Sequence, residues 1–399
     1  MSGKTARRWH IVPILVDELR RLPDTPRAPW ASTMYMTYTS RLDTLKMTST
    51  LARADHDEPG NSPAYPAPAS PQQRRVLVTG ATGFAGSAML RALAGGGYRV
   101  RALVRDRSHA RALELAGIEV AVGNMKDSAS LTRALRDVSV VYHFASIFRQ
   151  AGLPDEEFRS VNVEGPSRLI IAAAGAGVSR VVHISTVGVH GDIEHPPASE
   201  SSPFGPGDIY QRTKLEGEQQ AVCTAARLGV PLTVVRPAPM YGPRDRRLLK
   251  IFKGVAHRRF PILGSGDALF SMVHIDDLID GVRIAGESPS AVGRTYIIGS
   301  DEFLSLNALV ALIAEEAGVA PLGIHLPVWP FWAAGAMCEA VCAPLGIEPP
   351  LYRRRVAFFT KSRAFDITRA RTELGYAPKI SLRDGVRSTL AWYREAGWI

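Results

Sequence analysis

The stretch TGATGFAG, residues 79–86, decides the fold, because it joins a predicted strand at 75–79 to a predicted helix at 84–94. In such a unit the first glycine permits a tight turn, the second admits a pyrophosphate to the backbone, and the third lets the helix pack closely on the strand. The helix N-terminus then offers free N–H groups and a partial positive charge to phosphates. A purely structural turn is the alternative, but the strand–turn–helix context favours a dinucleotide site. Its predicted residues are Gly80, Thr82, Gly83, Phe84 and Gly86.

Around this stretch, short apolar runs alternate with helical patterns, which is typical of a parallel sheet covered on both faces. Repeated strand–helix units predict an α/β fold with a doubly wound parallel sheet over residues 74–243. Further strands are expected at 99–104, 118–122, 138–144, 180–185 and 232–236, and further helices at 156–174 and 208–228.

After about residue 244 the predicted strands become rare, so residues 244–399 are expected to form mainly a smaller, mostly helical substrate-binding lobe, with some elements returning to the sheet. Its helices are expected at 275–285, 306–317, 368–373 and 382–395. Residues 1–73 lack periodicity and end in a proline-rich stretch, which predicts a flexible N-terminal extension.

Composition narrows the class of function. The chain has 399 residues, of which 46% are apolar and 22% charged, and a net charge of +10. Its basic residues are spread along the chain without the aromatic-interleaved stripe of a nucleic-acid-binding protein, so no nucleic-acid partner is expected. An anionic cofactor or an acidic membrane surface explains the basic excess equally well. The three cysteines lack metal-ligand spacing, which predicts no metal site and a reducing cytoplasmic location.

The end of the second predicted strand bears on which dinucleotide binds. An acidic residue at this position binds the ribose of NAD, whereas an arginine accommodates the phosphate of NADP. Arg105 occupies the position and Asp106 follows it. NADP is therefore favoured, and NAD stays open because a shift of one residue would reverse the choice.

Tyr210 and Lys214 lie four residues apart in the predicted helix 208–228 and therefore share one helix face. A nearby ammonium favours the phenolate form of a tyrosine, which would let Tyr210 act as a general acid or base near neutral pH. Upstream, the apolar segment 182–191 (VHISTVGVHG) contains two hydroxyl residues, Ser185 and Thr186.

Four motifs, in this order along the chain, resemble those of the extended short-chain dehydrogenases. They are the three-residue glycine spacing at 79–86, the segment 182–191, the Tyr210–Lys214 pair and RPAPMYGP at 236–243. The resemblance covers residues 74–399 and implies a Rossmann fold. The branch includes nucleotide-sugar epimerases and dehydratases, 3β-hydroxysteroid dehydrogenases and dihydroflavonol reductases.

The resemblance also implies roles for individual residues. Thr186, five residues before Gly191, matches the catalytic hydroxyl, with Ser185 as the neighbouring candidate. Asn162, in VNVEG at 161–165, matches the asparagine that supports the lysine through water. At the cofactor, Asn124 replaces the usual aspartate but can still bond an adenine edge through its amide. The remaining residues implied at the cofactor are Met125, Ala145 and Pro237.

Departures from the family pattern bear on the substrate. Thr186 is followed by Val187 and Gly188, which have no acid–base capacity and argue against sugar dehydration. Phe270 stands where nucleotide-sugar enzymes carry an arginine for the substrate diphosphate. Arg244 and Arg246 are candidate substitutes for that arginine, so an epimerase is weakened rather than excluded.

The apolar segment 331–343 predicts either a buried helix of the lobe or an apolar substrate channel or membrane-facing patch. These features favour a secondary alcohol or ketone of sterol- or isoprenoid-like character as the small-molecule substrate. The alternatives are a nucleotide-sugar 4-epimerase and a non-catalytic protein that senses NADP. Peripheral membrane contact is left open, and the resemblance implies a homodimer formed through the helices at 156–174 and 208–228.

Overall fold

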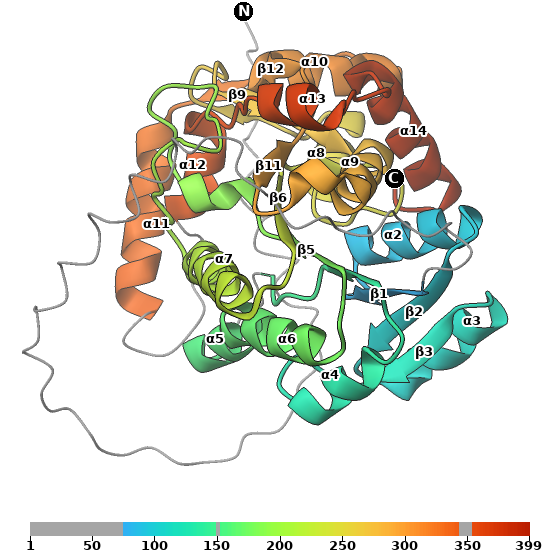
Figure 1. Cartoon of the computed structure of the whole chain (residues 1–399). Coiled ribbons are helices and arrows are strands. Elements are labelled where there is room, and N and C mark those ends of the chain that lie inside the picture. Colours follow the sequence, from blue (N-terminus) through green and yellow to red (C-terminus); the bar gives the residue numbers. More distant parts are fainter. Residues whose placement is uncertain (1–74, 149–151, 343–352) are drawn as a thin grey trace, which may run out of the picture. The chain divides into compact units, whose positions relative to one another are not determined.

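A seven-stranded parallel sheet lies at the centre of the computed structural model, which describes residues 75–148, 152–342 and 353–399 (Figure 1). The strand order is β11-β6-β5-β4-β1-β2-β3, and every neighbouring pair is parallel. The order reverses between β1 and β4, where α/β proteins bind ligands at the carboxyl ends of the strands. The predicted doubly wound α/β fold is confirmed. The strands are β1 (Arg75–Thr79), β2 (Arg99–Val104), β3 (Glu119–Val122), β4 (Val140–His143), β5 (Arg180–Ile184), β6 (Leu232–Pro237) and β11 (Thr295–Ile298).

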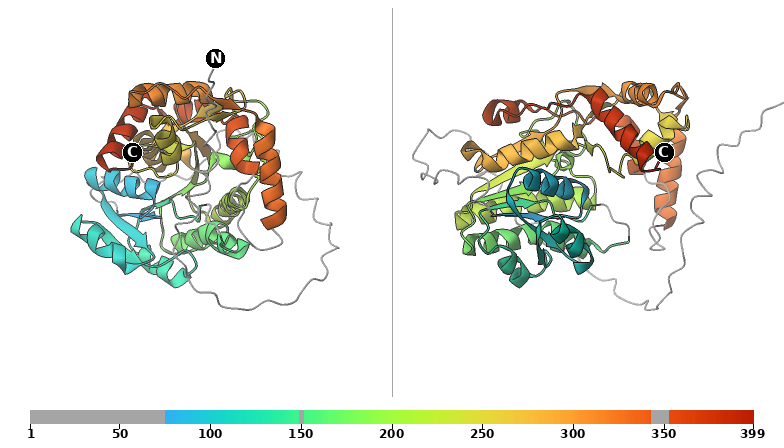
Figure 2. Two further views of the ribbon diagram at one scale, coloured as in Figure 1. Left: turned by 180° about the vertical axis from the view of Figure 1, so that it is seen from behind. Right: turned by 90° about the vertical axis from the view of Figure 1, so that its right-hand side faces the viewer.

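Helices cover both faces of the sheet. In β1, Val76 and Val78 belong to one hydrophobic cluster and Leu77 to another, because side chains alternate between the two faces of a strand. The cluster of Val76 includes α2 (Phe84–Gly95) and α9 (Ile275–Glu287). The cluster of Leu77 includes α4 (Ser128–Ala134), α6 (Glu164–Gly175) and α7 (Ile209–Leu228). In the side view of Figure 2 the green helices lie below the sheet and α9, yellow to orange, lies above it.

The sequence predicts a single helix at 156–174, and this prediction is wrong. The structure has α5 (Asp155–Asn162) and α6, which are separated at Val163. Pro166 has no N–H and cannot donate to the carbonyl of Asn162 four residues earlier, so the helical hydrogen bonding breaks there. That carbonyl packs instead against Gly217 of α7, where an added Cβ would lie 1.9 Å from the Asn162 oxygen.

The C-terminal part of the chain builds its own core, with two elements returning to the sheet. The edge strand β11 pairs with β6, and α9 packs on the sheet. A third cluster joins α8 (Leu249–Ala256), α10 (Leu306–Ala317) and α14 (Leu382–Glu395). The limits predicted for the domains stay predictions. The remaining elements of this part are β7 (Met240–Tyr241), β8 (Ile262–Leu263), β9 (Leu269–Ser271), β10 (Val273–His274), β12 (Phe303–Ser305), β13 (His325–Leu326), α11 (Val328–Cys342), α12 (Arg353–Thr360) and α13 (Thr368–Leu374).

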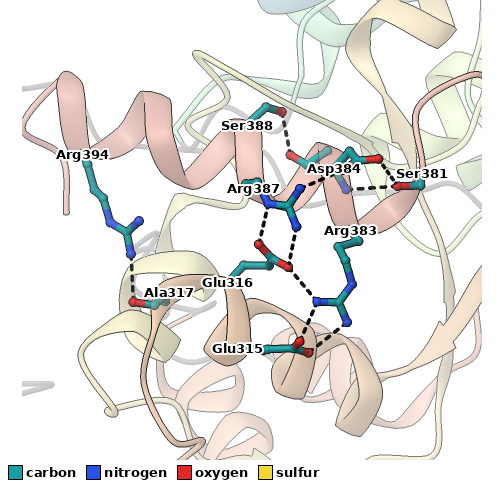
Figure 3. A network of polar contacts seen from close by, with 10 residues as sticks. Glu315, Glu316, Ala317, Ser381, Arg383, Asp384, Arg387, Ser388 and Arg394 are labelled. Atoms are coloured by element: carbon teal, nitrogen blue, oxygen red, sulfur yellow. Dashed lines mark hydrogen bonds and ion pairs between the residues drawn. The ribbon is translucent and has the colours of Figure 1, made fainter.

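An ionic network ties α10 to α14 on the outside of this core (Figure 3). Arg383 contacts both Glu315 and Glu316 at 2.7 Å, and Arg387 contacts Glu316 at 2.9 Å. Both glutamates lie in the last turn of α10, where the helix dipole disfavours negative charge. The arginines of α14 offset this effect and join the two helices.

Candidate active site

The glycine turn between β1 and α2 has the shape that a nucleotide needs. Gly80 has φ +68°, and a Cβ there would lie 2.7 Å from the backbone nitrogen of Ala145. A Cβ on Gly86 would lie 2.1 Å from the carbonyl oxygen of Gly80, so the helix packs on the turn as closely as predicted. Thr82 and Gly83 are exposed. The helix N-terminus has no side-chain cap and no acidic residue in its first turn, so its N–H groups can receive an anion.

The residues predicted to contact the adenosine half follow β2 and β3. Arg105 is exposed directly after β2. The carboxylate of Asp106 accepts a hydrogen bond from the Ser108 nitrogen at 2.9 Å, which lowers the pKa of Asp106 and caps the short helix 107–109. Asn124 is exposed after β3, whereas Met125 is buried in the core cluster of Leu77.

Lys214 brings its ammonium to the end of β5. Its side chain is 3% exposed, and Nζ donates to the carbonyl oxygen of Ile184 at 2.6 Å. Burial lowers the pKa of Lys214 to about 8. Ser185 and Thr186 directly follow Ile184, so the structure brings the lysine of α7 and the two hydroxyl residues to the same strand end.

The other catalytic candidates lie around this point. Tyr210 is half-buried in the first turn of α7, and the ring of Phe148 meets its ring edge-on at 4.9 Å. The Thr186 hydroxyl accepts a hydrogen bond from the Gly188 nitrogen at 3.1 Å. Ser185 is buried, and its hydroxyl has no hydrogen-bond partner within the described residues. Their catalytic roles stay predictions.

Asn162 joins the loop after β4 to the catalytic helix. Its side-chain oxygen accepts from the Ile147 nitrogen at 2.8 Å, and its amide donates to the Ile147 carbonyl and to the Thr213 hydroxyl. Because Thr213 precedes Lys214, Asn162 holds the helix beside the lysine. Its support of Lys214 through water stays a prediction.

Two buried histidines lie beside Lys214. His143 lies on β4 opposite His183 of β5, with ring centroids 5.2 Å apart. The Thr79 hydroxyl accepts from the Ala145 nitrogen at 3.2 Å and forms a hydrogen bond of 2.7 Å with His143 Nδ1. Burial and the charge of Lys214 lower the pKa of His143 to about 3 and that of His183 well below its usual value. Both imidazoles are therefore neutral in the neighbourhood of the Lys214 ammonium.

A buried ion pair supports the other side of α7. Arg236 of β6 and Glu218 of α7 are each 5% exposed, and Arg236 Nη2 lies 2.5 Å from Glu218 Oε1. Arg236 Nη1 also lies 3.2 Å from Nε2 of His190, whose Nδ1 faces the carbonyls of Ser202 and Pro203. Pro237, predicted at the cofactor, is buried at the end of β6. The sequence indicated Arg236 through its motif but gave no sign of its partner.

Asp276 and Asp277 begin the helix predicted at 275–285, and the sequence favours them as its cap; this prediction is wrong. The side chain that caps α9 is His274, whose Nδ1 accepts from the Asp276 nitrogen at 3.3 Å. Asp277 accepts instead from the backbone nitrogens of Lys379 and Ile380, at 2.9 and 3.0 Å. No local sequence signal indicates either contact, because histidine is not among the preferred N-cap residues and the partners of Asp277 lie about a hundred residues away in the sequence.

Comparison with known proteins gives relatives of several activities. The profile of the NAD dependent epimerase/dehydratase family matches residues 76–299. Sterol demethylase protein B of Methylococcus capsulatus is 30% identical over 342 residues, covering 81% of this chain and 99% of that protein. The dTDP-glucose 4,6-dehydratase of Streptomyces griseus is 30% identical over 339 residues, covering 80% of this chain and 94% of that protein. The 4-hydroxy-2-methyl-3-oxo-4-farnesyl-3,4-dihydroquinoline-1-oxide ketoreductase of Stigmatella aurantiaca is 28% identical over 318 residues, covering 78% of this chain and 94% of that protein.

Solved structures show the same architecture. The crystal structure of gox2253 is 32% identical and superposes with a TM-score of 0.70, covering 81% of this chain and 99% of that one. A double mutant of DesIV, a dTDP-glucose 4,6-dehydratase of Streptomyces venezuelae, was solved with NAD and DAU bound. It is 26% identical, has a TM-score of 0.65, and the match covers 81% of this chain and 98% of that one.

Proposed function

We propose a reaction for this chain, which belongs to the NAD dependent epimerase/dehydratase family and is an NAD(P)-dependent oxidoreductase of the extended short-chain dehydrogenase/reductase type. It interconverts a ketone and a secondary alcohol on an apolar, sterol- or isoprenoid-like molecule, with NADP as cofactor. The observation that carries this proposal is the placement of Lys214. Its ammonium is buried at the end of β5, where Ser185 and Thr186 follow, and one helical turn after Tyr210.

Each of these residues has a separate task in the proposed reaction. In ketone reduction, Tyr210 donates its phenolic proton to the substrate oxygen, and in alcohol oxidation it accepts that proton. Lys214 stabilises the negative charge that develops on the phenolic oxygen. Thr186 holds the substrate oxygen toward Tyr210. The turn at 80–86 and Arg105 would hold the dinucleotide, which gives or receives the hydride when bound.

Several observations support an apolar substrate. Phe270, in place of the diphosphate-binding arginine, is buried and packs against Phe358 at 5.0 Å. Of the two candidate substitutes, Arg246 stacks over the Trp398 ring at 5.0 Å, and Arg244 lies on an exposed loop where its charge acts on Arg91. Two relatives carry names that refer to a sterol and to a farnesyl-bearing ketone.

The proposal is tested by measuring cofactor oxidation with two substrate panels, one of sterol and other apolar ketones and one of UDP-hexoses. We expect NADPH to be consumed with at least one apolar ketone. Interconversion of UDP-hexoses without net change in the cofactor would instead establish a nucleotide-sugar 4-epimerase. Nucleotide binding without turnover on either panel would indicate a non-catalytic sensor of NADP.

The preference for NADP is expected to depend on Arg105. Asp106 already caps the helix at 107–109, which leaves Arg105 to meet a ribose phosphate. A hydrogen bond to a charged group contributes about 1.5–3 kcal/mol, so Arg105→Ala should weaken NADPH binding about 10- to 100-fold and leave NADH binding unchanged. Fluorescence titration of both nucleotides measures this, with the exposed Arg111→Ala as the matched control. Equal losses for NADPH and NADH would contradict the assignment.

The rate of ketone reduction is expected to fall as the pH rises above about 8, the pKa of Lys214. Burial lowers this pKa from 10.5, so the side chain is an ammonium below pH 8 and a neutral amine above it. The neutral amine no longer stabilises the charge that forms on Tyr210. In Lys214→Arg the cation persists at high pH, and the fall should move upward although the rate is lower. An unchanged fall near pH 8 in Lys214→Arg would contradict the role of the lysine.

We also propose that the protein is a cytoplasmic homodimer. Exposed apolar side chains on the adjacent helices α6 and α7, at Ile171, Val222 and Leu228, support pairing with a second copy. Cys223, Cys338 and Cys342 are all unpaired, which supports a reducing compartment. Light scattering on the purified protein tests the proposed stoichiometry.

A further inference from the structure

The helix α11 (Val328–Cys342) exposes only apolar side chains. Trp329 is 73% exposed, Met337 66%, Val341 58% and Trp332 52%. Ala333 and Ala340 are the other exposed residues of the helix. At 100° per residue, these six positions fall on one face of the helix. The apolar sequence in this region therefore does not form a buried helix of the lobe.

Such a face is unusual for a helix exposed to water, which normally presents charged or polar residues outward. Glu339 is the only charged residue of α11; it lies two turns after Trp332, at the edge of the exposed face, and its side chain is 26% exposed. Its carboxylate is bound by Arg353 of α12, which donates to it from the backbone nitrogen at 2.9 Å and from Nε at 2.7 Å. The acidic residue is thereby neutralised, and it does not hinder the approach of the face to an apolar or anionic surface.

Basic residues gather beside this helix. At its N-terminal end, β13 leads into α11 and pairs with β8, and the loop before β8 carries the exposed Arg258 and Arg259. At its other end, α12 packs against α11, and its first residue, Arg353, is 51% exposed and lies over the Trp332 ring at 5.7 Å. Tryptophan at an apolar face bordered by basic residues is typical of helices that lie in the interface of an anionic membrane.

We propose that α11 docks on an anionic lipid bilayer by burying the face that includes Trp329, Trp332, Met337 and Val341. This contact is peripheral, since no helix within the described ranges is long and apolar enough to cross a bilayer. The helix lies at the margin of the C-terminal part of the chain, together with α12 (Figure 1). The proposal goes beyond the proposed reaction, and its test requires no enzymatic activity.

The experiment is co-sedimentation of the full-length protein with vesicles of phosphatidylcholine alone and of phosphatidylcholine mixed equally with phosphatidylglycerol. The test variant is Trp329→Ser/Trp332→Ser. The matched control is Leu115→Ser, which removes an 81% exposed apolar side chain from the remote helix α3 (Ala110–Leu115). Because all three side chains are exposed, thermal unfolding should show that both variants fold as the wild type does.

We expect the wild type and Leu115→Ser to bind the anionic vesicles, and to bind less as salt is added. The double tryptophan variant should partition at least about tenfold less. Wild-type protein that stays in the supernatant, or a double variant that binds as the wild type does, would overturn the proposal. Light scattering on the same samples without lipid tests whether a second copy of the chain, and not a bilayer, covers this face. A change from dimer to monomer in the double variant would show that a second copy covers α11, and this would also overturn the proposal.

Discussion

The Tyr210→Phe protein is expected to lose about a thousandfold in kcat for ketone reduction while it still binds NADPH. General acid–base catalysis by a positioned side chain contributes about 10²–10⁴-fold, and phenylalanine removes only the hydroxyl. The glycine turn and the N-terminus of α2, where the nucleotide is expected, lie outside this change. Single-turnover oxidation of NADPH measures the chemical step, and fluorescence titration measures binding.

The control for this substitution is Tyr98→Phe, which also removes a phenolic hydroxyl. Tyr98 lies directly before β2, at the amino ends of the strands, and its hydroxyl bonds Glu287. This variant should keep the activity of the wild type. A Tyr210→Phe protein that reduces ketones at the wild-type rate would remove Tyr210 from the mechanism.

Arg236→Ala is expected to lower the free energy of unfolding by about 3–5 kcal/mol. The substitution leaves the Glu218 carboxylate buried without its partner, and breaking a buried ion pair in this way typically costs that much. Glu218 lies one turn after Lys214 on α7, so the loss should also disturb the position of the lysine. Urea unfolding followed by circular dichroism measures the change.

Two further variants test whether the loss of stability comes from the buried ion pair. Arg371→Ala breaks an ion pair with Asp301 in which both side chains are nearly half-exposed, and it should cost at most about 1 kcal/mol. Arg236→Met/Glu218→Leu removes both buried charges and should recover most of the loss. An Arg236→Ala protein that is no less stable than Arg371→Ala would contradict the buried pair.

The sheet was predictable from the sequence because its signals are local. Each central strand is a short apolar run that ends at a turn, and the limits 75–79 and 99–104 match β1 and β2. Edge elements carry weaker signals, and the four-residue strand β11 was not predicted. The break between α5 and α6 was readable from Pro166, but the apolar pattern on both sides of it masked the signal.

The candidate site was predictable where residues are spaced along one element. Tyr210 and Lys214 share a helix, and Thr186 lies close to a recognisable glycine. Contacts between distant elements were not predictable, because no local pattern links Glu218 with Arg236, or His143 with His183. The sequence left open whether the segment 331–343 is buried or exposed, since a helix that is apolar nearly all round has no periodicity to indicate which face meets water.

The central claim is hydride transfer to the carbonyl carbon of an apolar ketone. The most direct test is turnover with NADPH that carries deuterium at the transferred position of the nicotinamide, followed by mass spectrometry of the product. We predict an alcohol that carries one deuterium on its carbinol carbon and an equal amount of NADP, both formed about a thousandfold more slowly by Tyr210→Phe. The proposed hydride transfer would be contradicted if the ketone were recovered unreduced and unlabelled while UDP-hexoses were interconverted without net oxidation of the cofactor.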